Sequence, residues 1–353
     1  GGLIRIYRTL IIRNKSRIWR ENMAEPKESV MKKSMIAVLI PLLFSGCALI
    51  GKQKVQSIAV VQPPEFINNS IDVTYLQRST ITANVIAVVP ISGEISDGSN
   101  GGPNMVEDVK LMLRIAREDY RVRAIILKVD SPGGGVNASD LIWNEVMKFK
   151  KSGKPIVAFY NGIAASGGYY VSVPADKIIA TPETWTGSIG VIMWMADYSG
   201  KLKKDGVKYT VIKSGHRKDM LSPYKPAEKE DIEILQRIID GSYERFVQKV
   251  AQGRHMDESR VRILADGRIY DAEQALNNGL IDQIGYIEDS FEVAKTLAWI
   301  NDASLIELKS KKSVVNFFTL LGGKSSIEQC FPLKPSSLYY LWITDDLNLN
   351  KKK

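Results

Sequence analysis

Short, almost continuous apolar runs separated by helical patterns most strongly constrain the fold of this chain. Residues 85–91 (VIAVVPI), 124–130 (AIILKVD) and 155–160 (PIVAFY) are each typical of a strand buried on both faces. Helical spacing lies between them, at 105–119 and 138–153. Strands that alternate with helices of this length indicate βαβ units. The sequence therefore predicts an α/β fold with a mostly parallel sheet and covering helices.

The same alternation continues towards the C-terminus. Residues 177–181 (KIIAT) and 207–215 (VKYTVIKSG) are predicted to be two further strands, and residues 227–253 have the pattern of a long amphipathic helix. The chain has 353 residues, of which 44% are hydrophobic, so it can bury a sizeable core. We expect residues 83–308 to form the folded domain and residues 309–353 to form a loose tail.

The segment 31–47 has the layout of a secretory signal. Two lysines precede a short apolar stretch, and small residues then lead to Cys47. The stretch is short for a membrane span, and its ending F-S-G-C resembles a lipobox, although Phe44 stands where Leu, Val or Ile is usual. We expect Cys47 to be lipidated and to tether the protein to a membrane. Residues 1–30 are then an upstream or dispensable segment, and residues 48–82 a polar tether.

Charge and composition exclude several classes of function. The formal charge is +9, from 48 Lys and Arg against 39 Asp and Glu, which suits a nucleic acid or an anionic membrane as partner. The sequence has no RNP-type motif, zinc-binding spacing or arginine-rich reading helix, which argues against nucleic acid. Two cysteines and two histidines argue against a disulfide framework and against a Cys/His metal site.

A glycine-rich loop directly follows the strand at 124–130. In SPGGGV (131–136), the proline fixes one φ angle, and the glycines permit close backbone approaches. The loop is either a tight turn between a strand and a helix or a cradle whose N–H groups bind an anion, as in an oxyanion hole. A nucleotide-binding P-loop is disfavoured because no G-K-[ST] follows.

The stretch NGIAASGGYYVSVPA (161–175) surrounds Ser166 with very small residues. Either two backbones pack closely there, or a substrate comes close to the serine hydroxyl. The serine follows a buried strand and precedes a helical pattern, as in a nucleophile elbow, but Ala164 stands where G-x-S-x-G requires glycine. A helix N-terminus at this point would offer free N–H groups to a developing oxyanion.

The base that would activate this serine is not fixed by the residues alone. His255 lies in a turn between helices, and His216 lies beside Lys218 in KSGHRKDMLSP. A lysine can replace histidine only when it is neutral, and burial can lower the pKa of a lysine far enough for that. Thr186 and Ser188 supply hydroxyls that could orient the amine.

Four segments together resemble the signal peptide peptidase A family of serine-lysine peptidases. They are VDSPGGGV (129–136), the stretch from NGIAASGGYY to TGSIGVI (161–192), KSGHRKDMLSP (213–223) and GRIYDAEQALNNGLIDQIGYIEDS (267–290). The resemblance implies a Clp-protease/crotonase-like α/β spiral. It also implies cleavage of remnant signal peptides and other short hydrophobic peptides at membranes, with no metal or cofactor.

Carried over by motif, the resemblance implies that Ser166 of ASGGYY is the nucleophile and Lys218 of KSGxxKD the general base. The family's lysine stands 52 residues after the serine (218 − 166), which favours Lys218 over Lys213. Ser188 of TGSIG matches the serine that bonds to the lysine amine.

The same resemblance implies that the backbone N–H groups of Gly133 and Gly167 form the oxyanion hole. Members of the family with one copy of these motifs form rings in which neighbouring subunits supply the serine and the lysine, so a homo-oligomer is expected. Relatives usually carry a transmembrane anchor, whereas this chain has the lipobox-like end. We expect attachment on the extracytoplasmic face of a bacterial cell envelope.

Two other hypotheses compete with a membrane-attached serine endopeptidase. A crotonase-like acyl-CoA hydratase or isomerase would also use glycine-rich oxyanion loops, but it would need carboxylates as acid and base and no nucleophile. A non-catalytic lipoprotein scaffold would need neither Ser166 nor Lys218.

Overall fold

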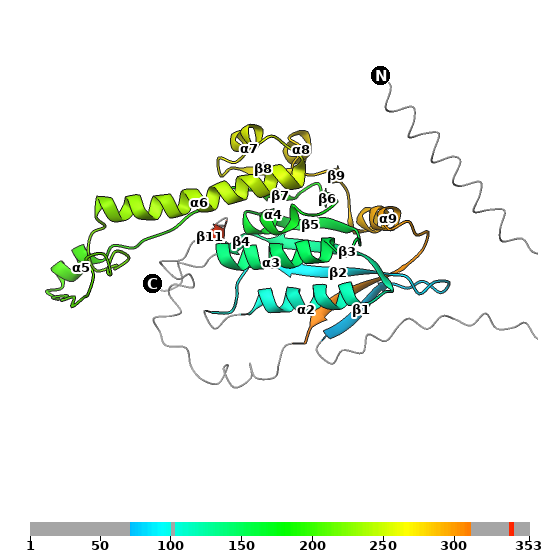
Figure 1. The fold of residues 1–353 in the computed structure, drawn as a ribbon, viewed down its shortest axis with the longest axis horizontal. Helices are drawn as coiled ribbons and strands as arrows, with labels where there is room; N and C mark the ends of the chain where they lie inside the picture. The colour runs from blue at the N-terminus through cyan, green and yellow to red at the C-terminus, as the bar shows by residue number, and fades with distance from the viewer. Residues whose placement is uncertain (1–70, 100–102, 312–338, 342–353) are drawn as a thin grey trace, which may run out of the picture. The chain divides into compact units, whose positions relative to one another are not determined.

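The structure, a computed structural model, describes residues 71–99, 103–311 and 339–341 (Figure 1). Within these ranges no helix combines the length and the apolar character needed to cross a membrane. The predictions for residues 1–47, lipidation of Cys47 among them, lie outside the described residues.

A mostly parallel sheet forms the centre of the fold. Its strands, in chain order, are β1 (Ile71–Gln77), β2 (Val85–Ser92), β3 (Val122–Ser131), β5 (Ile156–Ala165), β6 (Lys177–Ala180), β7 (Trp185–Gly187), β8 (Ile269–Asp271), β9 (Gln283–Ile284) and β10 (Ser304–Ser310). The main path is β1-β10-β2-β3-β5-β6-β9, and β7 and β8 branch from β5. The path is parallel from β10 to β9, and β1 pairs antiparallel with β10 at one edge.

Helices cover both faces of this sheet. In chain order the helices of the described residues are α2 (Met105–Glu118), α3 (Val136–Lys150), α4 (Gly167–Ser172), α5 (Ser199–Lys204), α6 (Lys229–Arg254), α7 (Glu258–Leu264), α8 (Ala272–Asn277) and α9 (Ile287–Leu297), and α5 lies away from the sheet (Figure 1). Side chains of α2, α3, α4 and α6 share one buried cluster with alternate residues of β2, β3 and β5. The residues between them point to the opposite face, where α9 packs (Figure 1).

This arrangement confirms the predicted α/β class and the mostly parallel sheet with covering helices. The buried runs at 85–91, 124–130 and 155–160 are β2, β3 and the start of β5. They were predictable because strands covered by helices on both faces need apolar side chains at almost every position.

The prediction of a strand at 207–215 was wrong. These residues are neither helix nor strand. Val207 and Tyr209 are exposed, and Ile212 is 98% exposed. The β-branched pattern alone was not sufficient, since a strand forms only where a neighbouring strand can pair with it.

The ends of the folded domain also differ from the prediction. Residues 71–77, within the expected tether at 48–82, form the edge strand β1. Within the expected tail, residues 339–341 form β11 (Tyr339–Leu341), which pairs antiparallel with β4 (Gly133–Gly135) in a separate two-stranded sheet. Both segments gain backbone hydrogen bonds from strands far away in the sequence, which local patterns do not predict.

Candidate active site

Ser166 lies at the junction between β5 and α4. It is the N-cap of α4, with φ 53° and ψ −114°, and its side chain makes no capping hydrogen bond. A serine with positive φ is unusual and costs about 1–3 kcal/mol, so the surrounding structure must hold it there. One support is the 2.8 Å hydrogen bond from its backbone N–H to the Gly187 carbonyl oxygen. The expected start of a helix directly after this serine is confirmed.

The small residues around Ser166 serve close packing as well. A Cβ atom on Gly168 would lie 2.7 Å from the carbonyl oxygen of Ser131, which no side chain tolerates. Ala164 and Ala165 are fully buried and pair with β7. Backbone packing therefore explains why residue 168 is glycine. It does not explain why a serine stands at position 166.

Ser166 and Ser188 line one cavity of about 580 Å³. Ser188 has φ 49°, and its backbone N–H donates to the Arg268 carbonyl oxygen over 2.8 Å. Ser166 is 1% exposed and Ser188 is 8% exposed. Within the described residues, neither hydroxyl has a hydrogen-bond partner. The structure thus brings together two of the residues singled out from the sequence.

The rest of the cavity wall is largely apolar. Its apolar members come from the segment after Ser188, from α6 and from the end of α7: Ile189, Val191, Ile192, Ile239, Tyr243 and Ala265. Asp240 and Asp266 also line it. No Lys, Arg or His belongs to its lining within the part of the chain that the structure describes.

The glycine loop forms the short strand β4 beside this site. Ser131 Oγ donates to the Gly93 carbonyl oxygen (2.6 Å) and accepts from Gly133 N–H (3.1 Å). The Gly133 N–H, which the sequence resemblance suggested as an oxyanion donor, therefore already has an acceptor. The Gly133 carbonyl and the Gly135 N–H both bond to Ile95.

Alternation along β4 places the Gly134 peptide groups on the other edge. Because Gly133 and Gly135 bond to Ile95, the N–H and C=O of Gly134 face away from Ile95, towards β11. Gly134 must remain glycine, since a Cβ there would lie 2.2 Å from the Ile95 carbonyl oxygen. The edge of β4 opposite Ile95 is thus the edge with which the antiparallel strand β11 pairs.

Lys218 does not reach Ser166 within one chain. It is exposed, it lies in the turn between α5 and α6, and it does not line the cavity. The cavity contacts α6 from Gln236 to Tyr243, which are 7 and 14 residues after its first residue, Lys229. At 1.5 Å per residue these contacts lie roughly 10 to 21 Å along the helix. Figure 1 shows the α5 region at the far N-terminal end of α6, away from the sheet.

Neither of the two histidines replaces Lys218 at the serine. His216 is exposed on the same turn, and its carbonyl oxygen accepts a hydrogen bond from Lys213 Nζ. His255 is the C-cap of α6, with φ 53°, and lines a different cavity. A serine-histidine pair within one chain is therefore excluded by the positions of these residues.

Comparisons with known proteins identify the family of this chain. The model of peptidase family S49 matches residues 148–301, which include Ser166, Ser188 and Lys218. Putative protease MJ0651 of Methanocaldococcus jannaschii is 37% identical over 246 residues, covering 67% of this chain and 79% of that protein. The chain belongs to peptidase family S49.

A putative signal peptide peptidase SppA from Enterococcus faecium is 49% identical over 199 residues, covering 56% of this chain. The chain spans 58% of the length of that relative. Among solved structures, a ClpP1 mutant from Listeria monocytogenes is similar with a TM-score of 0.39 and 20% identity, over 57% of this chain and 93% of that one. Other relatives of this chain are named protease 4 and serine protease. The predicted family and the serine-peptidase class are confirmed, and the acyl-CoA hydratase hypothesis is not supported.

Proposed function

We propose that the chain is a membrane-attached serine endopeptidase that hydrolyses remnant signal peptides and other short hydrophobic peptides. Ser166 forms the acyl-enzyme, and deprotonated Lys218 is the general base. The observation that carries the proposal is the Ser166 site. There a strained serine between a strand and a helix, whose hydroxyl has no partner in the described residues, lines a largely apolar cavity together with Ser188.

The reaction uses one proton carrier. Ser166 Oγ attacks the scissile carbonyl carbon while its proton passes to Lys218 Nζ. The tetrahedral intermediate collapses, the C–N bond breaks, and the leaving amine takes the proton from Lys218. Water then attacks the ester carbonyl and gives a proton to Lys218. That proton returns to Ser166 Oγ as the acid product leaves. Ser188 accepts a hydrogen bond from the lysine amine and orients it.

The oxyanion is stabilised by two backbone amides on opposite sides of the serine. Gly167 is the first residue of α4, so its N–H has no acceptor within the helix. For the second donor we propose Gly134 in place of Gly133. The Gly133 N–H bonds to Ser131 Oγ within the loop itself, whereas the Gly134 N–H faces the edge on which a substrate would take the place of β11. Donors at a helix N-terminus and on a glycine strand add a fixed positive potential where negative charge develops.

The lysine comes from a neighbouring copy of the chain. Support comes from the exposed position of Lys218 and from the absence of a cationic side chain around Ser166 in the described cavity lining. Insertion of the α5–α6 turn of one copy into the serine cavity of another would bury the amine. Burial favours its neutral form, which the reaction requires. The functional unit is then a homo-oligomer, as the sequence resemblance implied.

Substrates bind as an antiparallel strand on the edge of β4 opposite Ile95, in place of β11. The support is β11, which pairs with this edge in the register Leu341–Gly133, Tyr340–Gly134 and Tyr339–Gly135. Addition of a peptide strand to a sheet edge gives affinity through main-chain hydrogen bonds, and the adjacent apolar cavity selects hydrophobic side chains. Attachment to the membrane through Cys47 would keep the site close to such peptides.

Removal of the tail strand is expected to increase peptide cleavage, because β11 occupies the edge that a substrate would use. A chain truncated after Lys311 should show a kcat/KM for short hydrophobic peptides raised roughly severalfold, mainly through a lower KM. The matched control is truncation after Leu341, which keeps β11 and should behave like the full chain. Equal activity of the two truncated chains would contradict competition at this edge.

The proposed function is tested by covalent labelling with a serine-reactive phosphonate probe across pH. Wild-type protein should label at Ser166, and labelling should rise as pH increases, because the attacking hydroxyl transfers its proton to a deprotonated amine. Lys218→Ala should lose this rise. Absence of labelling of the wild type at every pH would contradict the proposal.

A further inference from the structure

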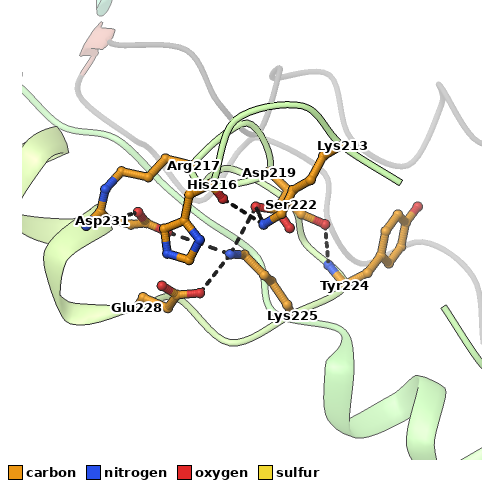
Figure 2. Close-up of polar contacts among 9 residues, drawn as sticks. All are labelled: Lys213, His216, Arg217, Asp219, Ser222, Tyr224, Lys225, Glu228 and Asp231. Atoms are coloured by element: carbon orange, nitrogen blue, oxygen red, sulfur yellow. Dashed lines mark hydrogen bonds and ion pairs between the residues drawn. The ribbon is translucent and has the colours of Figure 1, made fainter. Parts of the chain in front are cut away.

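The turn that carries Lys218 is built on a compact group of charged side chains. We call this group the ionic cluster; it consists of Lys213, Arg217, Asp219, Lys225, Glu228 and Asp231 (Figure 2). Three of its members are cations and three are carboxylates, so its formal charges cancel. Lys218 lies within this turn but is not one of the group's bonded residues.

The carboxylate next to Lys218 in the sequence is held by two other lysines. Asp219 Oδ1 lies 2.6 Å from Lys213 Nζ and 3.3 Å from Lys225 Nζ. The hydrogen bond from Lys213 lowers the pKa of Asp219, so this carboxylate stays ionised. Within the described ranges, Lys218 Nζ has no hydrogen-bond or ion-pair partner. Asp219 is therefore charged, and its carboxylate already pairs with Lys213 and Lys225.

The residue on the other side of Lys218 is also anchored. Arg217 Nη1 lies 2.6 Å from Asp231 Oδ1, and Asp231, in the first turn of α6, is only 1% exposed. Lys225 Nζ contacts the second oxygen of Asp231 at 3.7 Å and Glu228 at 3.0 Å. Lys225 thus links Asp219 to Asp231, the partner of Arg217. The two sequence neighbours of Lys218 are therefore held in one group of ion pairs (Figure 2).

The turn has its own backbone bonds, which limit its conformations. Lys218 N–H donates to the Gly215 carbonyl oxygen (3.2 Å), and Met220 N–H donates to the Arg217 carbonyl oxygen (3.2 Å). Ser222 N–H donates to the Asp219 carbonyl oxygen (2.9 Å). The backbone of the turn is closed and both neighbours of Lys218 are bonded, while the side chain of Lys218 itself is exposed.

This organisation matters because a base must be neutral, and a neighbouring carboxylate favours the protonated form of an amine. Opposite charges within about 4–6 Å stabilise the charged form, and the long flexible stem of a lysine lets its amine fold back onto the next residue. If Asp219 had no other partner, it would attract the Lys218 amine, hold it protonated and keep it from the serine of the neighbouring copy.

We propose that Lys213 and Lys225 are positioning residues for catalysis: by binding Asp219, they keep its carboxylate from pairing with Lys218 and fix the turn that presents the base. This inference rests on the proposed function, in which Lys218 is the base. Lys213 and Lys225 act through Asp219 and do not contact the reacting atoms.

The test is the pH profile of kcat/KM for a hydrophobic peptide, measured on full-length variants. Lys213→Met/Lys225→Met frees the Asp219 carboxylate, and the acidic limb of the profile should move to higher pH by about one unit. On that limb, activity at a fixed pH should fall roughly tenfold. Adding Asp219→Asn to this double variant should return the limb to its wild-type position.

A matched control separates this effect from the loss of two positive charges. Lys201 and Lys203 lie on α5, are exposed and have no ion-pair partner within the described residues. Lys201→Met/Lys203→Met changes the net charge equally and should leave the limb in place. The other charged groups around the turn and the serine cavity are unchanged in all variants: His216, Arg217, Glu228, Asp231, Asp240 and Asp266.

Two outcomes would overturn the inference. One is an acidic limb of the kcat/KM profile that does not move in Lys213→Met/Lys225→Met. A purely structural role of these lysines would lower the plateau of the profile and leave the limb in place. The other is a limb that moves but is not restored by Asp219→Asn. Wild-type activity of Lys218→Ala would instead refute the proposed function, so the two failures are distinguishable.

Discussion

Ser166→Ala is expected to lower kcat/KM for peptide hydrolysis by about 10⁴- to 10⁶-fold, which is the usual cost of removing the nucleophile of a serine peptidase. Without Oγ no acyl-enzyme forms, and the oxyanion amides and the cavity alone give only weak catalysis. Peptide binding should change little, because the cavity wall and the β4 edge remain. The measurement is a Michaelis analysis with a fluorogenic hydrophobic peptide.

The matched control for this substitution is Ser139→Ala. Ser139 is a fully buried serine of α3 whose hydroxyl has no hydrogen-bond partner within the described residues, and it does not line the Ser166 cavity. The Ser139→Ala chain should stay folded and keep its activity. If Ser166→Ala kept even a tenth of the wild-type rate, the assignment of the nucleophile would be wrong.

Lys218→Ala should have the second-largest effect, a fall in kcat of about 10⁴-fold with KM nearly unchanged. In the proposed mechanism the lysine carries protons in both half-reactions, so its loss should slow acylation and deacylation. Its side chain is exposed and without a partner in the described residues, so the substitution should not change the unfolding midpoint of a single copy. Lys208→Ala is the matched control, since Lys208 is an exposed lysine that also lies between α5 and α6 and has no ion-pair partner in the described residues.

A result in the opposite direction would identify another base. If Lys218→Ala stayed active while His216→Ala lost activity, the histidine on the same turn would have to be the proton carrier. His216 and Lys218 are both exposed on this turn and neither lines the serine cavity of its own chain, so the activities of the two variants decide between them.

Much of the fold could be predicted because burial leaves a direct trace in the sequence. The runs that became β2, β3 and β5 are apolar at nearly every position, as strands covered on both faces must be. The edge strand β1 alternates between buried and exposed residues, and its partner β10 is more than 200 residues away. The pairing with so distant a strand leaves no local signal, which is why the sequence predicts a tether over these residues.

The sequence singled out individual residues of the candidate site but not their arrangement. The small residues around Ser166 and the motif with Ser188 indicated two hydroxyls that the structure places in one cavity. The choice between Gly133 and Gly134 depends on which amide bonds to Ser131 Oγ, a tertiary contact that composition does not show. The separation of Lys218 from Ser166 within one chain is likewise a tertiary feature. It arises because Lys218 precedes α6, whereas the serine cavity contacts α6 further along the helix.

The ionic cluster could not be recognised from the sequence alone. Lysines and aspartates are common in exposed segments, and their usual interpretation is a solvated surface. Only the buried position of Asp231 and the short distances to Arg217 and Lys225 distinguish this group from ordinary surface charges. The KSGxxKD pattern did contain the relevant carboxylate, directly beside the predicted base.

The central claim is that each active site combines Ser166 of one copy with Lys218 of another, and it is tested by mixing two inactive variants. Ser166→Ala and Lys218→Ala chains, unfolded and refolded together in equal amounts, should recover about a quarter of wild-type activity, since one site in four then combines both intact residues in a closed homo-oligomer. Each variant refolded alone should stay inactive. Absence of recovered activity in co-refolded oligomers of normal size would contradict the claim.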